Sequence, residues 1–214
     1  MSEKSTSLRE RRAQLTRDEI LRAARRLFAE RGYARTSVRE IAKAAGVSAQ
    51  TVYDSVGSKQ ALVSQLNDLI DSEAGIPVLA RAAADSDDPR EVAATSARVT
   101  RSILENCSDI IHALVTGAAA EPELAAVLAE GQRRHLGGAG GVVGVLRRLD
   151  ALAPADPDEA AETLAAITDI RFALVLQESY GWSLDRLESW MTATSRTLLL
   201  REPSPGQGTQ HRDT

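Results

Sequence analysis

Residues 36–59 constrain the fold of this 214-residue chain more than any other stretch, because they predict two short helices joined by a glycine turn. Ser37 and Glu40 have the spacing of a capping box, in which a hydroxyl and a carboxylate satisfy backbone amides at a helix start. Gly46 stands where a chain leaving a helix often needs a left-handed residue, and Ser48 can cap the second helix. The apolar side chains of the first helix recur at helical spacing: Val38, Ile41, Ala42 and Ala45.

The second predicted helix has an apolar side and a polar side. Val52 and Val56 lie four residues apart and should face a core. Small or polar side chains should face away from it: Ala49, Gln50, Thr51, Tyr53 and Asp54. This layout is typical of a helix-turn-helix, whose second helix enters the major groove of DNA. Short helix pairs with glycine turns also occur in proteins that bind no DNA, so the flanking sequence decides between the two interpretations.

The flanks extend the pattern into a larger domain. Thr16 and Glu19 predict another capping box ahead of an apolar stripe. Beyond the pair, Ser58 and Lys59 lead into a helix with leucines at 62, 66 and 69. The whole segment resembles the tetracycline-repressor (TetR) family at Leu27-Phe28, Gly32-Tyr33, Thr36-Ser37-Val38, Ile41-Ala42, Ala44-Ala45-Gly46-Val47-Ser48, Thr51-Val52-Tyr53, Ser58-Lys59 and Leu62. The resemblance covers about a quarter of the chain. It departs at Val56, where the family more often has an aromatic residue, and we interpret this valine as a packing variant.

Charge is distributed unevenly along the chain. Residues 1–59 hold 13 Lys/Arg against 7 Asp/Glu, whereas the remainder holds 13 against 23. A basic first quarter on an acidic body is the pattern expected when one end of a protein meets phosphate. A solvated basic face without a partner would look the same if the helix-turn-helix pattern were absent.

The remaining composition narrows the class of protein. Strand signals are nearly absent and helical periodicity dominates, so we expect an all-α fold. Cys107 is the single cysteine, which excludes an intramolecular disulfide and fits a reducing cytosol. No apolar run is long enough to span a bilayer and no signal-peptide core is present, so we expect a soluble, cytoplasmic protein without membrane contact.

The sequence predicts four segments. Residues 1–15 are expected to be a flexible basic arm and 16–74 a three-helix DNA-binding domain plus a linking helix, with the motif at about 37–56. Residues 75–201 should form a helical ligand-binding and dimerisation domain, and 202–214 a disordered tail.

Within the body, Asp88-Pro89 should start a helix that runs to about Asn106, and the next should span about 108–119. Another helix should begin at Glu121-Pro122, but glycines crowd positions 137–144, where either the helix breaks or backbones approach closely. The last two helices are expected at about 157–178 and 183–200.

The predicted DNA-binding residues divide by chemistry. Thr36 and Ser37 at a helix start can bind phosphate, and Tyr53 and Lys59 resemble the backbone-contacting positions of the family. Base contact is expected from Ala49, Gln50 and Thr51, with Gln50 able to bind an adenine edge bidentately. Ser48 completes the predicted set.

The resemblance implies a homodimer and a small-molecule effector. The family's dimers usually form through the last two helices, so Leu187, Trp190 and Leu198 are the expected interface residues. His112, Phe172 and Gln177 are candidates for the effector pocket, although core or interface packing is the more common role of such residues.

The sequence thus predicts a DNA-binding transcriptional regulator, a repressor that an effector releases from a palindromic operator. A helical protein-interaction adaptor and a small helical enzyme are the alternatives. Against an enzyme, no metal-spaced His/Cys cluster, nucleophile–base pair or phosphate-binding glycine loop is recognisable. Accordingly, we expect no cofactor and no metal.

Overall fold

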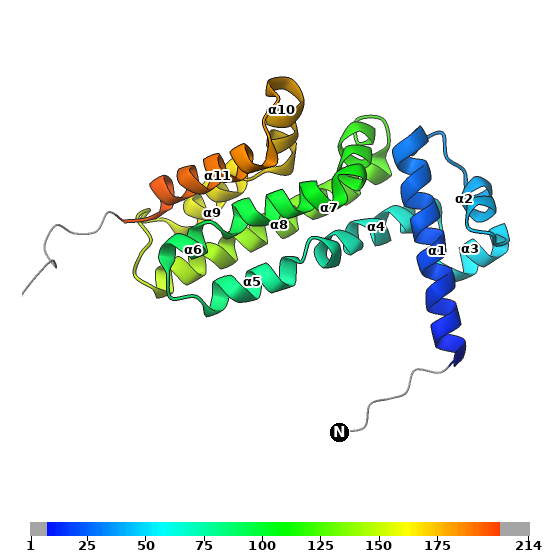
Figure 1. Ribbon diagram of the computed structural model, residues 1–214, viewed down its shortest axis with the longest axis horizontal. Coiled ribbons are helices and arrows are strands. Elements are labelled where there is room, and N and C mark those ends of the chain that lie inside the picture. Colours follow the sequence, from blue (N-terminus) through cyan, green and yellow to red (C-terminus); the bar gives the residue numbers. More distant parts are fainter. Residues whose placement is uncertain (1–7, 202–214) are drawn as a thin grey trace, which may run out of the picture. The chain divides into compact units, whose positions relative to one another are not determined.

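A computed structural model describes residues 8–201 of the chain, which fold into eleven helices (Figure 1). The helices are α1 (Leu8–Arg31), α2 (Val38–Ala44), α3 (Ala49–Ser55), α4 (Lys59–Glu73), α5 (Ile76–Asp85), α6 (Pro89–Ala93), α7 (Thr95–Gly117), α8 (Pro122–Arg148), α9 (Pro157–Ile167), α10 (Ile170–Tyr180) and α11 (Leu184–Leu199). The fold is all-α, as predicted. Within this range, no helix combines the length and the apolar character needed to cross a membrane.

The contacts of the chain divide into two compact units. The first unit holds the residues up to Val78 together with Val99–His135, and the second holds Leu79–Arg98 together with the residues from Leu136 onward. Most of α7, from Val99 onward, and the first half of α8 therefore group with the helix-turn-helix residues. This grouping does not follow the domain boundary that we predicted at residue 75.

The N-terminal helices of the first unit pack around a small apolar core. α1 contacts α2, α3 and α4, and α2 contacts α3. Ile20, Ile41, Val52 and Leu62 are completely buried, one from each of these helices. Burying one such side chain contributes about 1.5–3 kcal/mol, so these four residues contribute much of the stability that holds the short helices together.

Serine caps define where the short helices begin. Ser37 accepts a hydrogen bond from the backbone amide of Glu40, whose carboxylate accepts one from the Ser37 amide, so the predicted capping box is present. Ser48 caps α3 and Ser58 caps α4 in the same way, each accepting from an amide three residues later. The local sequence is therefore sufficient to set these three starts.

The first helix is longer than predicted. α1 begins at Leu8, so residues 8–15 of the predicted arm are helical. Leu, Arg, Glu, Ala and Gln favour helix, and the Thr16 hydroxyl donates to the Arg12 carbonyl within the helix instead of capping a new one. Residues 1–7 of the predicted arm and the predicted tail at 202–214 lie outside the described residues.

The second unit surrounds its own core. Apolar side chains of α8 line up at helical spacing and face residues of α6, α9 and α11, with Ala139, Val142, Val143, Leu146 and Leu199 among the buried members. α11 lies against α6 and α9. Arg196 of α11 donates from Nε to the Arg90 carbonyl at 3.0 Å, which ties α11 to α6.

Four features of the body resolve or correct the prediction. The break between the helices predicted to end at Asn106 and to start at Ser108 exists as non-helical Cys107 inside α7. The helix predicted from Pro89 to about Asn106 is divided, because α6 ends at Ala93 with Ala94 as its cap and α7 begins at Thr95. The glycines at 137–144 neither break α8 nor meet a neighbouring backbone within the described residues, because they occupy its exposed side. The helix predicted at 157–178 is two helices, because Asp169 accepts from the amides of Arg171 and Phe172 and starts α10 anew.

Candidate nucleic-acid interface

The turn between α2 and α3 leaves one face of α3 exposed to solvent. Gly46 adopts φ 68°, a left-handed conformation that glycine reaches at little cost. Val52 and Val56 of α3 are buried, which confirms both the predicted core face and the interpretation of Val56 as a packing variant. Gln50 and Tyr53 lie on the outer side, and the Tyr53 residue is 53% exposed.

Ordered polar contacts pre-position several side chains of this face. The Gln50 amide donates from Nε2 to Asp54 Oδ1 at 2.8 Å, one helical turn later. The hydroxyls of Ser48 and Thr51 are hydrogen-bonded to each other at 2.8 Å. The second Nε2 hydrogen and the Oε1 atom of Gln50 are not used in this contact, and these are the groups that pair with an adenine edge.

The prediction for Thr36 is wrong. Its side chain is buried, and its hydroxyl donates to the Gly32 carbonyl at 2.9 Å and contacts the Leu27 carbonyl at 3.3 Å. Thr36 therefore closes the end of α1 and is not available to phosphate. Ser37 is exposed at the start of α2, as predicted, although its hydroxyl also contacts the Glu40 carboxylate.

Lys59 lies at the start of α4, with its amine above the ring of Tyr33. The Nζ atom is 3.8 Å from the ring centroid, a cation–π contact. Burial lowers the pKa of Lys59, and the carboxylates of Glu121 and Glu123 oppose that effect. Burial also raises the pKa of Tyr33, and the same two carboxylates add to the rise. A phosphate that reaches this lysine must therefore compete with these two carboxylates and with that of Glu40.

An ion-pair cluster on α1 joins the helix-turn-helix residues to α7. Arg25 donates from Nε and Nη2 to the two carboxylate oxygens of Asp109, at 2.5 and 2.7 Å. It also donates from Nη1 to Glu73 at 2.5 Å and from Nη2 to the Asn106 carbonyl at 2.9 Å. The two α7 partners flank Cys107, so Arg25 fastens α1 to the break in α7.

This cluster shifts the pKa values of its members. Burial alone would raise the pKa of Asp109, but the hydrogen bonds and charge of Arg25 outweigh it and hold the pKa below its usual range. Hydrogen bonds to Asp109, together with those to Glu73, raise the pKa of Arg25. No local sequence pattern predicts this cluster, because Arg25 and Asp109 are 84 positions apart.

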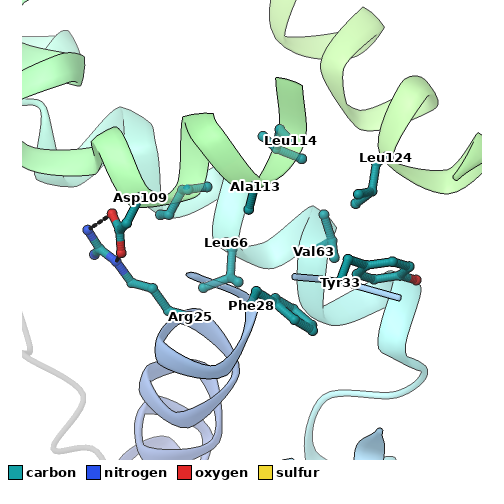
Figure 2. Close-up of a pocket in the computed structure, with 10 residues that line it drawn as sticks. Arg25, Phe28, Tyr33, Val63, Leu66, Asp109, Ala113, Leu114 and Leu124 are labelled. Carbon is teal, nitrogen blue, oxygen red and sulfur yellow. Dashed lines mark hydrogen bonds and ion pairs between the residues drawn. The ribbon is translucent and has the colours of Figure 1, made fainter. Parts of the chain in front are cut away.

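A small apolar cavity lies beside the ion pair. Figure 2 shows Phe28 and Tyr33 below Leu66 and Val63 of α4, with Leu114 of α7 and Leu124 of α8 above them. The cavity encloses about 20 Å³, room for roughly one water molecule. It is therefore too small for an effector, since sites for drug-sized ligands measure about 300–1,000 Å³.

The predicted effector residues occupy different surroundings. His112, in the first unit, is exposed, and its Nδ1 lies 2.8 Å from the Ser108 carbonyl. In the second unit, Phe172 packs against Trp190 with ring centroids 5.8 Å apart, and Gln177 is half-buried. Their assignment to an effector pocket stays a prediction.

The predicted interface residues also differ from one another. Leu187 is completely buried inside the described chain, because its side of α11 packs into the core of the second unit. It cannot form an interface directly, and that assignment is corrected. Trp190 is half-buried and Leu198 is exposed, so both remain available to a partner.

Comparison with known proteins identifies the helix-turn-helix region. A profile of the family described as "Bacterial regulatory proteins, tetR family" matches residues 20–66. The HTH-type transcriptional regulator AcrR of Shigella flexneri is 44% identical over 63 residues. That match spans 29% of this chain and 29% of AcrR, less than a third of either protein.

Solved structures match a much larger part of the chain. NalD, the secondary repressor of the MexAB-OprM multidrug efflux pump of Pseudomonas aeruginosa, has a TM-score of 0.68 at 24% identity, covering 90% of this chain and 99% of NalD. A SmeT–triclosan complex has a TM-score of 0.72 at 22% identity, covering 88% of this chain and 93% of SmeT. At these identities the likeness shows a shared fold. Residues 20–66 thus match the helix-turn-helix region of the tetR family of bacterial regulatory proteins, and most of the chain shares the fold of these solved repressors.

Proposed function

We propose that the protein is a DNA-binding transcriptional regulator, a repressor that leaves its operator when a small molecule binds. The observation that carries this proposal is the exposed polar face of α3, with Gln50 held by Asp54 and Tyr53 projecting outward. A helical adaptor would not need this face or the basic residues around it. The relatives are transcriptional regulators, and two solved neighbours repress efflux pumps.

The contacts divide into two kinds. Gln50, Ala49 and Thr51 would read base edges, whereas Tyr53, Lys59, Ser37 and Ser48 would contact the phosphate backbone and set the register. Because phosphate contacts carry no sequence information, Lys59→Ala and Tyr53→Phe should weaken binding to every sequence similarly and flatten the salt dependence. Gln50→Ala should cost about 1–3 kcal/mol at particular base pairs only.

The test uses a duplex that the wild-type protein selects from a random DNA pool, together with its single-base variants. Gln50→Ala should lose affinity only where particular base pairs are changed. Lys59→Ala and Tyr53→Phe should lose affinity by a similar factor for every duplex in the set. Equal losses across every duplex for all three would refute the division of contacts. A wild-type protein that selects no sequence would refute the proposed function itself.

The proposed assembly is a homodimer formed through α10 and α11. These helices expose the apolar side chains of Phe172, Val175, Tyr180 and Leu198, and Trp190 contacts both Phe172 and Trp182. A dimer fits the proposed function because two recognition helices together read enough base pairs for useful specificity.

The proposed effector is a small molecule bound by the helical body. SmeT, a solved neighbour of the same fold, has a structure in complex with triclosan. His112, Phe172 and Gln177 remain the proposed contacts, and binding of a candidate compound to variants at these three positions tests them.

A further inference from the structure

The carboxyl end of α3 is held by side chains from two other helices. Arg17 of α1 donates from Nη1 to the Ser55 carbonyl at 3.3 Å. Gln65 of α4 donates from Nε2 to the Val56 carbonyl at 2.9 Å. The last carbonyls of a helix have no partner within it, so these two bonds satisfy backbone acceptors that α3 cannot satisfy itself.

Gln65 makes this bond under an unusual condition. Its Oε1 atom is buried and has no hydrogen-bond partner within the described residues. A buried acceptor without a partner costs free energy, and turning the amide over would only bring two oxygens together at Val56. An apolar side chain of similar length would avoid that cost. Packing alone therefore does not explain a glutamine here, and the bond to Val56 is the feature that distinguishes it.

The rest of α3 leaves its orientation weakly determined. The helix has seven residues, too few to be stable alone, and its buried anchors, Val52 and Val56, lie on one narrow stripe. A short helix held along one stripe can roll or tilt about it. Bonds from Arg17 and Gln65 reach its end from two neighbouring helices and oppose both movements.

A tilt of α3 would matter most at the base-reading residue. Gln50 lies five to six residues before the two held carbonyls, roughly 8 Å along the helix axis at 1.5 Å per residue. A tilt of about 10° at the held end would displace Gln50 by roughly 1.4 Å. A displacement of this size exceeds the tolerance of hydrogen bonds to a base edge.

We propose that Arg17 and Gln65 are positioning residues for sequence readout, which fix the orientation of α3 against the bases without touching DNA. This inference rests on the proposed function. Loss of either bond should reduce discrimination between the operator and other DNA, and leave general phosphate binding nearly unchanged.

The experiment compares Gln65→Met with Gln60→Met. Gln60 is an exposed residue of the same helix, so it controls for the chemical change. The dissociation constants are measured for the selected duplex and for a scrambled duplex of equal length, together with the thermal midpoint. Gln65→Met should lower at least tenfold the ratio of the dissociation constant for the scrambled duplex to that for the selected duplex. It should change scrambled-duplex binding less than twofold and leave the thermal midpoint unchanged or raised. Gln60→Met should leave the ratio as in the wild type.

The Arg17 bond is tested by a conservative and a non-conservative change. Arg17→Met should lower the same ratio, and Arg17→Lys, which keeps a donor and the charge, should restore most of it. Equal loss of affinity for both duplexes would instead make Arg17 a phosphate contact and overturn its assignment.

Two results would overturn the assignment of Gln65. One is a ratio within twofold of wild type. The other is a lowered thermal midpoint with proportional loss of affinity for both duplexes, which would show a merely structural role. A wild-type protein that does not discriminate between the duplexes would refute the proposed function instead.

Discussion

Replacing Arg25 by methionine tests the junction between α1 and α7. The change keeps most of the side-chain length but removes hydrogen bonds to Asp109, Glu73 and the Asn106 carbonyl. Losing such bonds leaves two carboxylates without their counter-ion. If the cluster were fully buried, this would cost about 3–5 kcal/mol. The side chains of Arg25, Glu73 and Asp109 are 23%, 37% and 35% exposed, so solvent screening reduces the expected loss to about 2 kcal/mol.

Arg22→Met is the matched control on the same helix. Among the described residues, Arg22 pairs with Glu19 alone, and both side chains are more than half exposed, so its loss should cost less than about 0.5 kcal/mol. For a chain of this size, the Arg25 variant should unfold about 4–8 °C lower and the control about 2 °C lower at most. Thermal unfolding followed by circular dichroism measures both. Equal midpoints for the two variants would refute the argument.

The same cluster predicts a pH dependence. The pKa of Asp109 in the folded chain lies below its ordinary value, so its contribution to stability is complete above the unfolded pKa of about 3.9. The contribution is lost as the pH falls through the folded pKa, where the folded carboxylate takes up its proton. The stability difference between the wild type and Arg25→Met should therefore be constant at neutral pH and shrink as the pH falls, first through the raised pKa that burial gives Asp109 in the variant and then through its lowered pKa in the wild type. A difference that stays constant into acid would contradict the ion-pair explanation.

Three further predictions concern DNA binding and assembly. Glu121→Gln combined with Glu123→Gln removes two negative charges near the amine of the α4 lysine and should raise affinity for any duplex about two- to tenfold at low salt; unchanged affinity in filter binding would contradict this. Asp54→Asn weakens the acceptor that orients Gln50 and should reduce discrimination at one adenine position about tenfold, measured on single-base operator variants. Leu198→Arg should yield helical monomers in sedimentation, and a wild type that is already monomeric at micromolar concentration would end the dimer proposal.

The sequence predicted those parts of the fold that short segments determine. A cap needs only a side chain and an amide two or three residues later, so Ser37, Ser48, Asp88 and Ser183 each start the expected helix. The exposed face of α3 was predictable for the same reason. The two buried valines and the exposed polar residues of this segment follow one another within one or two helical turns, so the local spacing is enough to separate the two faces.

The errors have long-range causes. Thr36 is a residue type that can bind phosphate at a helix start, but its hydroxyl donates to the Gly32 carbonyl at the end of α1. The glycines of α8 lower helix propensity, yet α8 continues because Val142, Val143 and Leu146 bury a continuous stripe in the second unit. Arg17, Gln65 and Arg25 act on partners 38, 9 and 84 positions away, and no local spacing identifies such pairs.

The contacts of α4 show how a ligand could control the DNA-binding helices. α4 bonds to the end of α3 through Gln65 and to Arg25 of α1 through Glu73, so a shift of this helix strains one contact near its middle and one at its carboxyl end. An effector can shift the equilibrium only by its differential affinity for the two states. Regulatory coupling of about 1–3 kcal/mol changes affinity about 5–150-fold, and the loss of about 2 kcal/mol expected for the Arg25 cluster is of that size. Breaking this cluster in only one of the two states would therefore be sufficient for regulation.

Arg25→Met should therefore reduce the factor by which an effector weakens operator binding. Because linkage is reciprocal, operator DNA should weaken effector binding by the same factor, and the variant should reduce both factors equally. Titrating one effector with and without operator, for the wild type and Arg25→Met, measures all four affinities. Arg22→Met, which leaves the cluster intact, should couple as the wild type does. If Arg25→Met couples as strongly as Arg22→Met, the cluster does not distinguish the two states, and regulation must act through other contacts.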